Sequence, residues 1–135
     1  MKRICRHFYK KEKGFTLVEL MIVIIILAVL TGIAIPSYMA LRNRARESTT
    51  EAEMKNIATA LELCMADIEI YPATLTITAY MDPVPANDAW GKTYVYAQTG
   101  SGTGYTLTSY GVDGATAGDD DIVFTNGQMT STGTY

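Results

Sequence analysis

The chain has 135 residues, of which 48% are hydrophobic and 19% are charged, so it suits one small domain with an appendage. Its charge is unevenly divided: residues 1–14 carry six basic side chains and one acid, whereas residues 15–135 carry five basic side chains and thirteen acids. The acidic balance of the larger part argues against nucleic acid as a partner, because its phosphates would be repelled.

An apolar run follows the basic start. Residues 15–35 are 21 residues with a single charge, Glu19. At about 1.5 Å per residue, a helix of that length spans about 31 Å, which matches the hydrocarbon core of a bilayer. The run is rich in β-branched residues, but in lipid only a helix satisfies its own backbone over such a length. The basic stub at 1–14 is therefore expected to stay on the cytoplasmic side.

A second helical segment is expected beyond Pro36, which can kink a helix without ending it. Apolar residues recur in steps of three and four, the pattern of an amphipathic helix that packs on a flat surface. Tyr71-Pro72 should end this helix. We therefore predict one long helix from about residue 15 to residue 70. Its apolar seam consists of Met54, Ile57, Leu61, Cys64 and Ile68.

The composition changes after Pro72, where Thr, Tyr, Gly and Asp become frequent. Residues 92–97 and 105–110 alternate like strands around a glycine-rich turn, so they are predicted to form a β-hairpin. A loop at 111–121 and a short strand at 122–124 follow, and the tail after Gly127 is expected to be loosely held.

The predicted fold class is therefore α+β. A long N-terminal helix, with a membrane half and an amphipathic half, packs on a small antiparallel β-sheet head. The corresponding segments are 1–14 (a leader that is removed), 15–35 (a transmembrane or fibre-core helix), 36–71 (an amphipathic helix) and 72–135 (a β head with an acidic loop).

The residue types that often carry catalysis are scarce. The two cysteines, Cys5 and Cys64, lie on opposite sides of the apolar run, so no disulfide is expected within one membrane-spanning chain. Cys64 is predicted to be a small buried apolar residue. The only histidine, His7, lies in the basic stub, and the sequence contains no GxSxG, zinc-type or phosphate-loop pattern. These features favour a protein that is not an enzyme.

The most specific pattern lies at the start of the apolar run. The stretch 13–20, KGFTLVEL, places Glu19 inside an apolar helix, where inserting a carboxylate costs about 2.5–3.5 kcal/mol. This stretch resembles the class III signal of type IV prepilins and type II secretion pseudopilins. The resemblance implies cleavage after Gly14 by a prepilin peptidase and N-methylation of Phe15. It also implies that Glu19 meets the N-terminal amine of a neighbouring subunit, so that each charge relieves the burial cost of the other.

Two simpler interpretations compete with this one. Gly32-Ile33-Ala34 has small residues at the spacing that the general signal peptidase requires, so the run could belong to a plain secretory signal. That interpretation puts Glu19 in the apolar core and makes the run too long. The run could also be an ordinary single-span anchor with an incidental acid.

Parts of the head resemble the major pseudopilins. The resemblance covers the helix end at 66–72, the Asp-x-Trp-Gly turn at 88–94, the Ser-x-Gly-x-Asp-Gly element at 109–114 and the Asp-Asp-Ile of 120–122. The chain departs from that pattern at Ala89, where the family has proline, and lacks a longer segment before the turn. Trp90 is predicted to be a packing anchor.

The loop at 111–121 supplies four carboxylates and has no lysine or arginine nearby in the sequence. Calcium takes roughly six to eight oxygen ligands from carboxylates, carbonyls and water on flexible loops. The resemblance implies a Ca²⁺ ion here, and the alternative is a solvated acidic loop. The implied side-chain ligands are Asp113, Asp120 and Asp121, with Asp119 (if the register slips by one) and the backbone oxygens of Tyr110 and Ala115 as further candidates.

These features predict a structural subunit of a helical, pilus-like filament. It is expected to cross the inner membrane once, with its head in the periplasm, before it joins a periplasmic or extracellular filament. The resemblance favours the major pseudopilin of a type II secretion system, which moves folded proteins across the outer membrane. Its implied partners are further copies of the chain, a prepilin peptidase, an inner-membrane assembly platform with an ATPase, and minor pseudopilins.

Two other functions stay open at this point. The nearest is a type IV pilus subunit that serves adhesion, motility or DNA uptake. The alternative from another class is a membrane-anchored calcium-binding domain that never polymerises.

Overall fold

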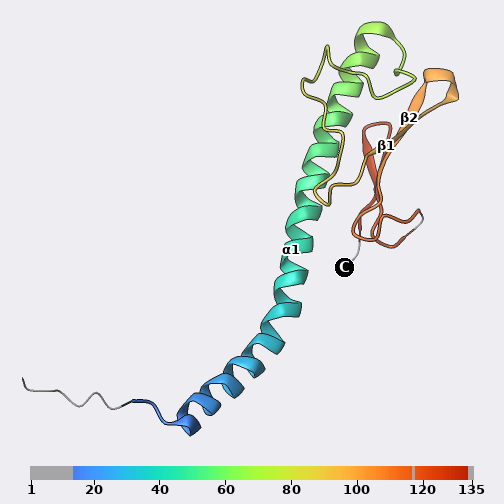
Figure 1. Ribbon diagram of the computed structural model, residues 1–135. Coiled ribbons are helices and arrows are strands. Elements are labelled where there is room, and N and C mark those ends of the chain that lie inside the picture. The colour runs from blue at the N-terminus through green and yellow to red at the C-terminus, as the bar shows by residue number, and fades with distance from the viewer. Residues whose placement is uncertain (1–13, 117, 134–135) are drawn as a thin grey trace, which may run out of the picture. The chain divides into compact units, whose positions relative to one another are not determined.

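The computed structural model describes residues 14–116 and 118–133, and the predicted leader, including Cys5 and His7, lies almost entirely outside them. The chain divides into an N-terminal unit, 1–37, and a head unit, 38–135. The elements in chain order are α1 (Leu17–Ile68), β1 (Val95–Thr99), the 3₁₀ turn η1 (Gly100–Gly102), β2 (Gly104–Ser109), β3 (Ile122–Thr125) and β4 (Gln128–Ser131) (Figure 1).

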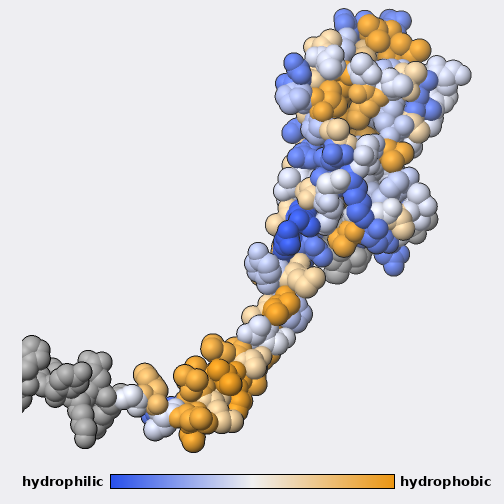
Figure 2. All heavy atoms as spheres, viewed as in Figure 1, coloured by the Kyte–Doolittle hydropathy of each residue, from blue (hydrophilic) through white to orange (hydrophobic). Residues whose placement is uncertain are grey.

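The described part of the N-terminal unit is helical from Leu17 and apolar on every side. Its large hydrophobic side chains are all half or more exposed within the chain, and Figure 2 shows them covering the helix surface. By length and composition, α1 qualifies as a membrane-spanning helix. The hydroxyls of Thr31 and Ser37 donate to the carbonyls of Leu27 and Ile33, so these polar groups are satisfied within the helix. A surface of this kind requires lipid or another apolar surface around it.

In the head unit, the later part of α1 packs on a four-stranded antiparallel sheet with the strand order β1-β2-β3-β4. The predicted seam is confirmed at four positions, because Met54, Ile57, Leu61 and Cys64 are all buried. The sheet contributes the facing side of the core, and every second residue of β2 and β3 points inward. These buried strand residues are Tyr105, Leu107, Ile122 and Phe124.

The prediction for Ile68 was wrong, since its side chain is 52% exposed. Ile68 is the last residue of α1, and the chain reverses immediately afterwards with Glu69 at a φ of 60°. The loop then brings Tyr71 and Ile77 onto the core, where both are buried. The backbone N–H of Tyr71 donates to the carbonyl of Gly102 at 3.0 Å, which attaches this loop to the turn of the hairpin.

The predicted hairpin is present, but its first strand starts three residues later than expected. Strands β1 and β2 pair antiparallel from Val95 opposite Thr108 to Thr99 opposite Gly104. Thr93 lies before β1 and forms an isolated bridge with Asn87 instead. The alternating pattern at 92–97 therefore included residues of a preceding turn, because alternation alone does not show where a strand starts.

The prediction of a loosely held tail after Gly127 was wrong for residues 128–131, which form β4. Asn126 and Gly127 both have positive φ, and this two-residue turn leads into β4, which pairs with β3 along Thr125, Phe124 and Val123. A two-residue turn with positive φ at both positions suits an Asn-Gly hairpin. The Asn126-Gly127 pair was the signal for this hairpin in the sequence.

Three tyrosines from the head loops and β1 region donate to carboxylates on α1. Tyr94 donates to Glu53 at 2.8 Å, Tyr71 donates to Glu62 at 2.9 Å, and Tyr80 donates to Asp67 at 2.6 Å. Burial is the main cause that raises the pKa of Tyr71 to about 12, and the neighbouring Glu62 carboxylate is the second cause. Burial raises the pKa of Tyr105 to about 12 as well, and its ring meets that of Tyr71 edge-on, with centroids 4.8 Å apart.

The head should lose stability at alkaline pH. The raised pKa values mean that the fold favours neutral phenols, so their contribution is complete below the ordinary pKa of 10.0 and is lost as the pH rises through about 12. Thermal midpoints measured by circular dichroism should fall over this range, together with the appearance of tyrosinate absorbance. Tyr71→Phe should flatten part of this fall, and a midpoint independent of pH in this window would contradict the assignment.

Candidate functional site

The start of α1 is organised by Thr16 and Glu19. The backbone N–H of Thr16 donates to Oε2 of Glu19 at 2.8 Å, and the Thr16 hydroxyl donates to the same oxygen at 2.9 Å. The backbone N–H of Glu19 donates to Oγ1 of Thr16 at 3.2 Å. This reciprocal pair is a capping box, which satisfies the first backbone donors of a helix. The Thr-x-x-Glu spacing in the sequence is the signal for this capping box, but the sequence-based prediction named only Glu19.

The capping box holds the Glu19 carboxylate beside the point where the helix starts. Gly14 and Phe15 precede this point, and both are exposed, Phe15 at 84%. A carboxylate offers about four acceptor sites, and the capping box uses two of them on Oε2. The arrangement can therefore accept further donors, such as an ammonium group from another chain.

The aspartate loop connects β2 to β3. Asp120 and Asp121 are almost completely buried, whereas Asp113 and Asp119 are exposed. The backbone N–H of Asp113 donates to Oδ2 of Asp120 at 3.1 Å, and Asp113 Oδ1 accepts from the N–H of Ala115 at 2.7 Å. The carbonyl of Tyr110 accepts from the N–H of Gly114 at 2.9 Å.

Gly118 is the point at which two of the predicted ligands converge. A Cβ built there would lie 2.7 Å from Oδ1 of Asp120 and 3.3 Å from Oδ2 of Asp113, so both carboxylates face the backbone of Gly118. A Cβ at Gly111 would likewise collide with Asp120. Glycine therefore leaves open the space around these oxygens, which are the hard donors that calcium prefers.

The structure brings together Asp113 and Asp120, but not all of the predicted carboxylates around one point. Within residues 14–116 and 118–133, no three His, Cys, Asp or Glu side chains lie close enough together to hold a metal ion. Calcium also accepts backbone carbonyls and water, so a pair of carboxylates in a loop suits it in donor chemistry.

The fold also brings a cation to this loop. Lys92 is distant in sequence, yet its Nζ donates to the carbonyl of Val112 at 2.8 Å. A Cβ at Gly114 would collide with the Lys92 side chain, so only glycine allows this close approach. Sequence proximity gave no sign of this contact, because it depends on how the hairpin folds over the loop.

Asp88 is a structural residue next to the site, and the sequence-based prediction treated it only as part of a turn. Its carboxylate is buried, and Oδ1 accepts from the backbone N–H groups of Trp90 and Lys92, both at 2.9 Å. Its Oδ2 accepts from the hydroxyl of Ser109 at 2.6 Å. Asp88 therefore joins the tryptophan turn to the end of β2, where the aspartate loop begins.

Asp88→Ala should destabilise the head by about 2–4 kcal/mol, because it leaves two backbone donors and a buried hydroxyl without their acceptor. Urea unfolding followed by circular dichroism measures this change in the free energy of unfolding. The matched control is Asp82→Ala, since Asp82 is exposed and should change that free energy by less than about 0.5 kcal/mol. Equal effects of the two variants would contradict the role of Asp88.

Comparison with known protein families gives two adjoining matches. Residues 9–35 match the prokaryotic N-terminal methylation motif, and residues 37–125 match the family described as type II secretion system (T2SS), protein G. The first match contains Gly14, Phe15 and Glu19, and the second contains the tryptophan turn and the aspartate loop. No solved structure matches the chain significantly.

Curated proteins with similar sequences have one name in common, type II secretion system core protein G. The protein of this name from Pseudomonas aeruginosa is 30% identical over 130 residues, covering 83% of this chain and 92% of the relative. The one from Escherichia coli is 31% identical, covering 83% and 90%. The one from Vibrio cholerae is 26% identical, covering 82% and 87%.

Proposed function

Since the chain belongs to the type II secretion system protein G family, we propose that it is cut after Gly14, N-methylated on Phe15 and polymerised into the pseudopilin filament of such a system. The filament would serve the movement of folded proteins across the outer membrane. The work of the chain in this proposal is structural, with no catalytic step of its own.

The single observation that carries this proposal is the apolar helix with one carboxylate. Every large hydrophobic side chain from Phe15 to Ile35 is exposed within the chain, and Glu19 is the sole charge among them. Such a helix is stable in lipid, and it can leave lipid only if another apolar surface replaces it. Helices from further copies of the chain provide that surface and form the core of the filament.

Glu19 sets the register of this assembly. Cleavage after Gly14 creates a positive amine on Phe15, and the Glu19 carboxylate of the adjacent subunit accepts it. The two charges attract strongly in an apolar core, and each relieves the cost of burying the other. The capping box supports this role, because it holds the carboxylate at the helix start with acceptor capacity remaining.

The chain has a membrane stage before assembly in this proposal. Before assembly the chain crosses the inner membrane once, with residues 1–14 in the cytoplasm and the head in the periplasm, since the basic end of a span stays inside. The implied partners are a prepilin peptidase, an inner-membrane assembly platform with its ATPase, and minor pseudopilins.

Calcium is the ligand of the aspartate loop in this proposal. Asp113 and Asp120, whose carboxylates face Gly118, would hold the ion, with Asp121 or Asp119 and the backbone oxygens of Tyr110 and Ala115 as further ligands. A bound cation would offset the repulsion among these carboxylates and tie the loop to β3. The hydrogen bond from Lys92 to the carbonyl of Val112 also attaches the loop to the tryptophan turn.

Glu19→Gln should abolish filament assembly, reducing pelletable filaments by about tenfold or more, because breaking a buried ion pair costs about 3–5 kcal/mol. Sheared filaments quantified by immunoblot, and secretion of an exported protein, measure this effect. Glu69→Gln is the control, since Glu69 is exposed in the head and lies outside the apolar helix that would form the filament core.

Mass spectrometry of these proteins separates processing from assembly. The wild type and both variants should begin at N-methylated Phe15. A mature chain that begins at Met1, or normal filaments from Glu19→Gln, would contradict the proposed function and favour a membrane-anchored domain that does not polymerise.

The calcium proposal predicts a thermal shift in the head fragment that begins at Tyr38, the start of the head unit. Saturating Ca²⁺ should raise the unfolding midpoint by on the order of 10 °C relative to chelator, because a ligand of the native state stabilises it. Asp120→Asn should remove the shift, whereas Asp82→Asn should retain it. An unchanged wild-type midpoint would count against the site.

A further inference from the structure

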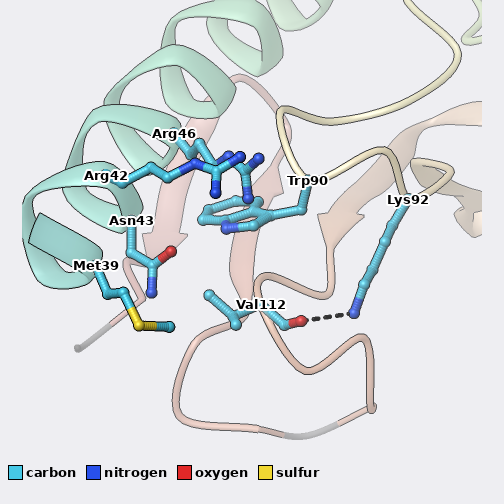
Figure 3. A pocket seen from close by; sticks show the side chains of 7 residues that line it. All are labelled: Met39, Arg42, Asn43, Arg46, Trp90, Lys92 and Val112. Atoms are coloured by element: carbon cyan, nitrogen blue, oxygen red, sulfur yellow. Dashed lines mark hydrogen bonds between the residues drawn. The ribbon is translucent and has the colours of Figure 1, made fainter. Parts of the chain in front are cut away.

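A second polar site in the head unit has no role in the proposed function so far. It is a pocket of about 280 Å³ between α1, the tryptophan turn and the start of the aspartate loop. Three cations and one indole line it: Arg42 and Arg46 from α1, and Trp90 and Lys92 from the turn (Figure 3). Met39 and Val112 add apolar surface to the wall.

The two arginines and the tryptophan lie together in this pocket (Figure 3). Figure 3 shows Arg42 and Arg46 reaching from neighbouring turns of α1 over the ring of Trp90, with Val112 on the opposite side. Lys92 donates one of its three N–H groups to the carbonyl of Val112 at 2.8 Å, which directs its ammonium toward the aspartate loop. Arg46 and Trp90 are half-buried, so the pocket is part of the folded head.

The charge of this pocket contrasts with that of the rest of the chain. Residues 15–135 contain five basic side chains against thirteen acids, yet three of the five line this pocket. None of the lining residues, all of which lie in the described part of the chain, is acidic. The pocket is therefore built for an anionic ligand. Guanidinium groups match the oxygens of a phosphate in pairs, and lysine adds a point charge.

The position of these residues in the chain indicates which anion is present. Arg42 lies 25 residues after Leu17, the start of α1, or about 38 Å along the helix. A bilayer that includes both headgroup layers is about 40–45 Å thick, so a helix that spans it brings Arg42 to the outer headgroup layer. Tyr38, Met39 and Leu41 are all more than half exposed beside the arginines, and amphipathic side chains and tryptophan are typical of this interface.

The arginines also contradict the usual distribution of charge around a membrane span. Basic residues gather on the cytoplasmic side and are scarce on the translocated side. Here Arg42, Arg44 and Arg46 follow the span on the side proposed to be periplasmic. A specific ligand on that side explains why two of them lie beside Trp90 in one pocket (Figure 3).

We propose that this pocket binds the phosphodiester headgroup of an anionic phospholipid in the outer leaflet of the inner membrane, while the subunit waits in the membrane before assembly. This inference rests on the membrane-inserted stage of the proposed function. The lipid would hold the head against the membrane surface, and extraction into the filament would release it.

Trp90 is the single tryptophan of the chain, so its fluorescence reports on the pocket directly. The mature full-length chain is placed in nanodiscs of phosphatidylcholine with increasing phosphatidylglycerol. The wild-type emission should shift with phosphatidylglycerol content and saturate. Arg46→Gln and Arg42→Gln should each raise the content needed for half of the shift by about fivefold or more, the loss expected when one hydrogen-bonded contact with the headgroup is removed.

Arg44→Gln is the matched control, because it removes the same charge from the same helix, but Arg44 is exposed and does not line the pocket. Its half-shift content should stay within about twofold of the wild type. An unchanged thermal midpoint verifies folding, and the exposed Arg42 provides the second variant if Arg46→Gln fails to fold.

Each other outcome overturns the proposal in a distinct way. Equal effects of Arg44→Gln and Arg46→Gln would show diffuse attraction to a charged surface. A full shift caused by inorganic phosphate in pure phosphatidylcholine discs would show a free-anion site. A shift that occurs only when filaments assemble would assign the pocket to a second copy of the chain. A chain that does not co-elute with any nanodisc refutes membrane insertion itself, and with it the proposed function.

Discussion

The structure depends on the placement of one carboxylate in a helix that water cannot solvate favourably. Glu19 is the sole charge in residues 15–35, where every large hydrophobic side chain is exposed within the chain. The hydrophobic effect drives this surface into lipid or against other helices, and the carboxylate makes either environment costly unless a cation is present. The capping box with Thr16 satisfies local backbone donors and keeps the carboxylate at the helix start. Membrane insertion and assembly are thus two solutions to the same burial problem.

The head solves a different problem with different interactions. It has a small core, in which one face of α1 packs on the inward residues of β2 and β3. Hydrogen bonds attach the surrounding loops to this core. Tyr71, Tyr80 and Tyr94 attach the loops to carboxylates on α1. Asp88 joins the tryptophan turn to β2, and Lys92 extends from that turn to the aspartate loop. The tryptophan turn therefore supports both the aspartate loop and the basic pocket.

The periodic features of the fold could be predicted because they repeat along the chain. The helix, its buried seam up to Cys64, the hairpin and the strand at Ile122 follow from spacing alone, since burial on one side imposes a fixed period. The exposed Ile68, the later start of β1 and the ordered strand after Gly127 could not be predicted in this way. Each of these three features depends on which other segment of the chain packs there. The spacing of residues within one helix or strand does not show which segments pack against it.

The proposed processing site could be predicted from the sequence because it is local: Gly14, Phe15 and Glu19 lie within six consecutive residues. The carboxylates of the aspartate loop could be seen in the sequence, but only the folded chain shows that Asp113 and Asp120 both face Gly118 and that Lys92 contacts the loop. The basic pocket could not be predicted from the sequence, since Arg42 and Trp90 are 48 positions apart in the chain. Local order specifies helices and processing signals, whereas sites built from distant side chains exist only after the core has closed and brought their backbones together.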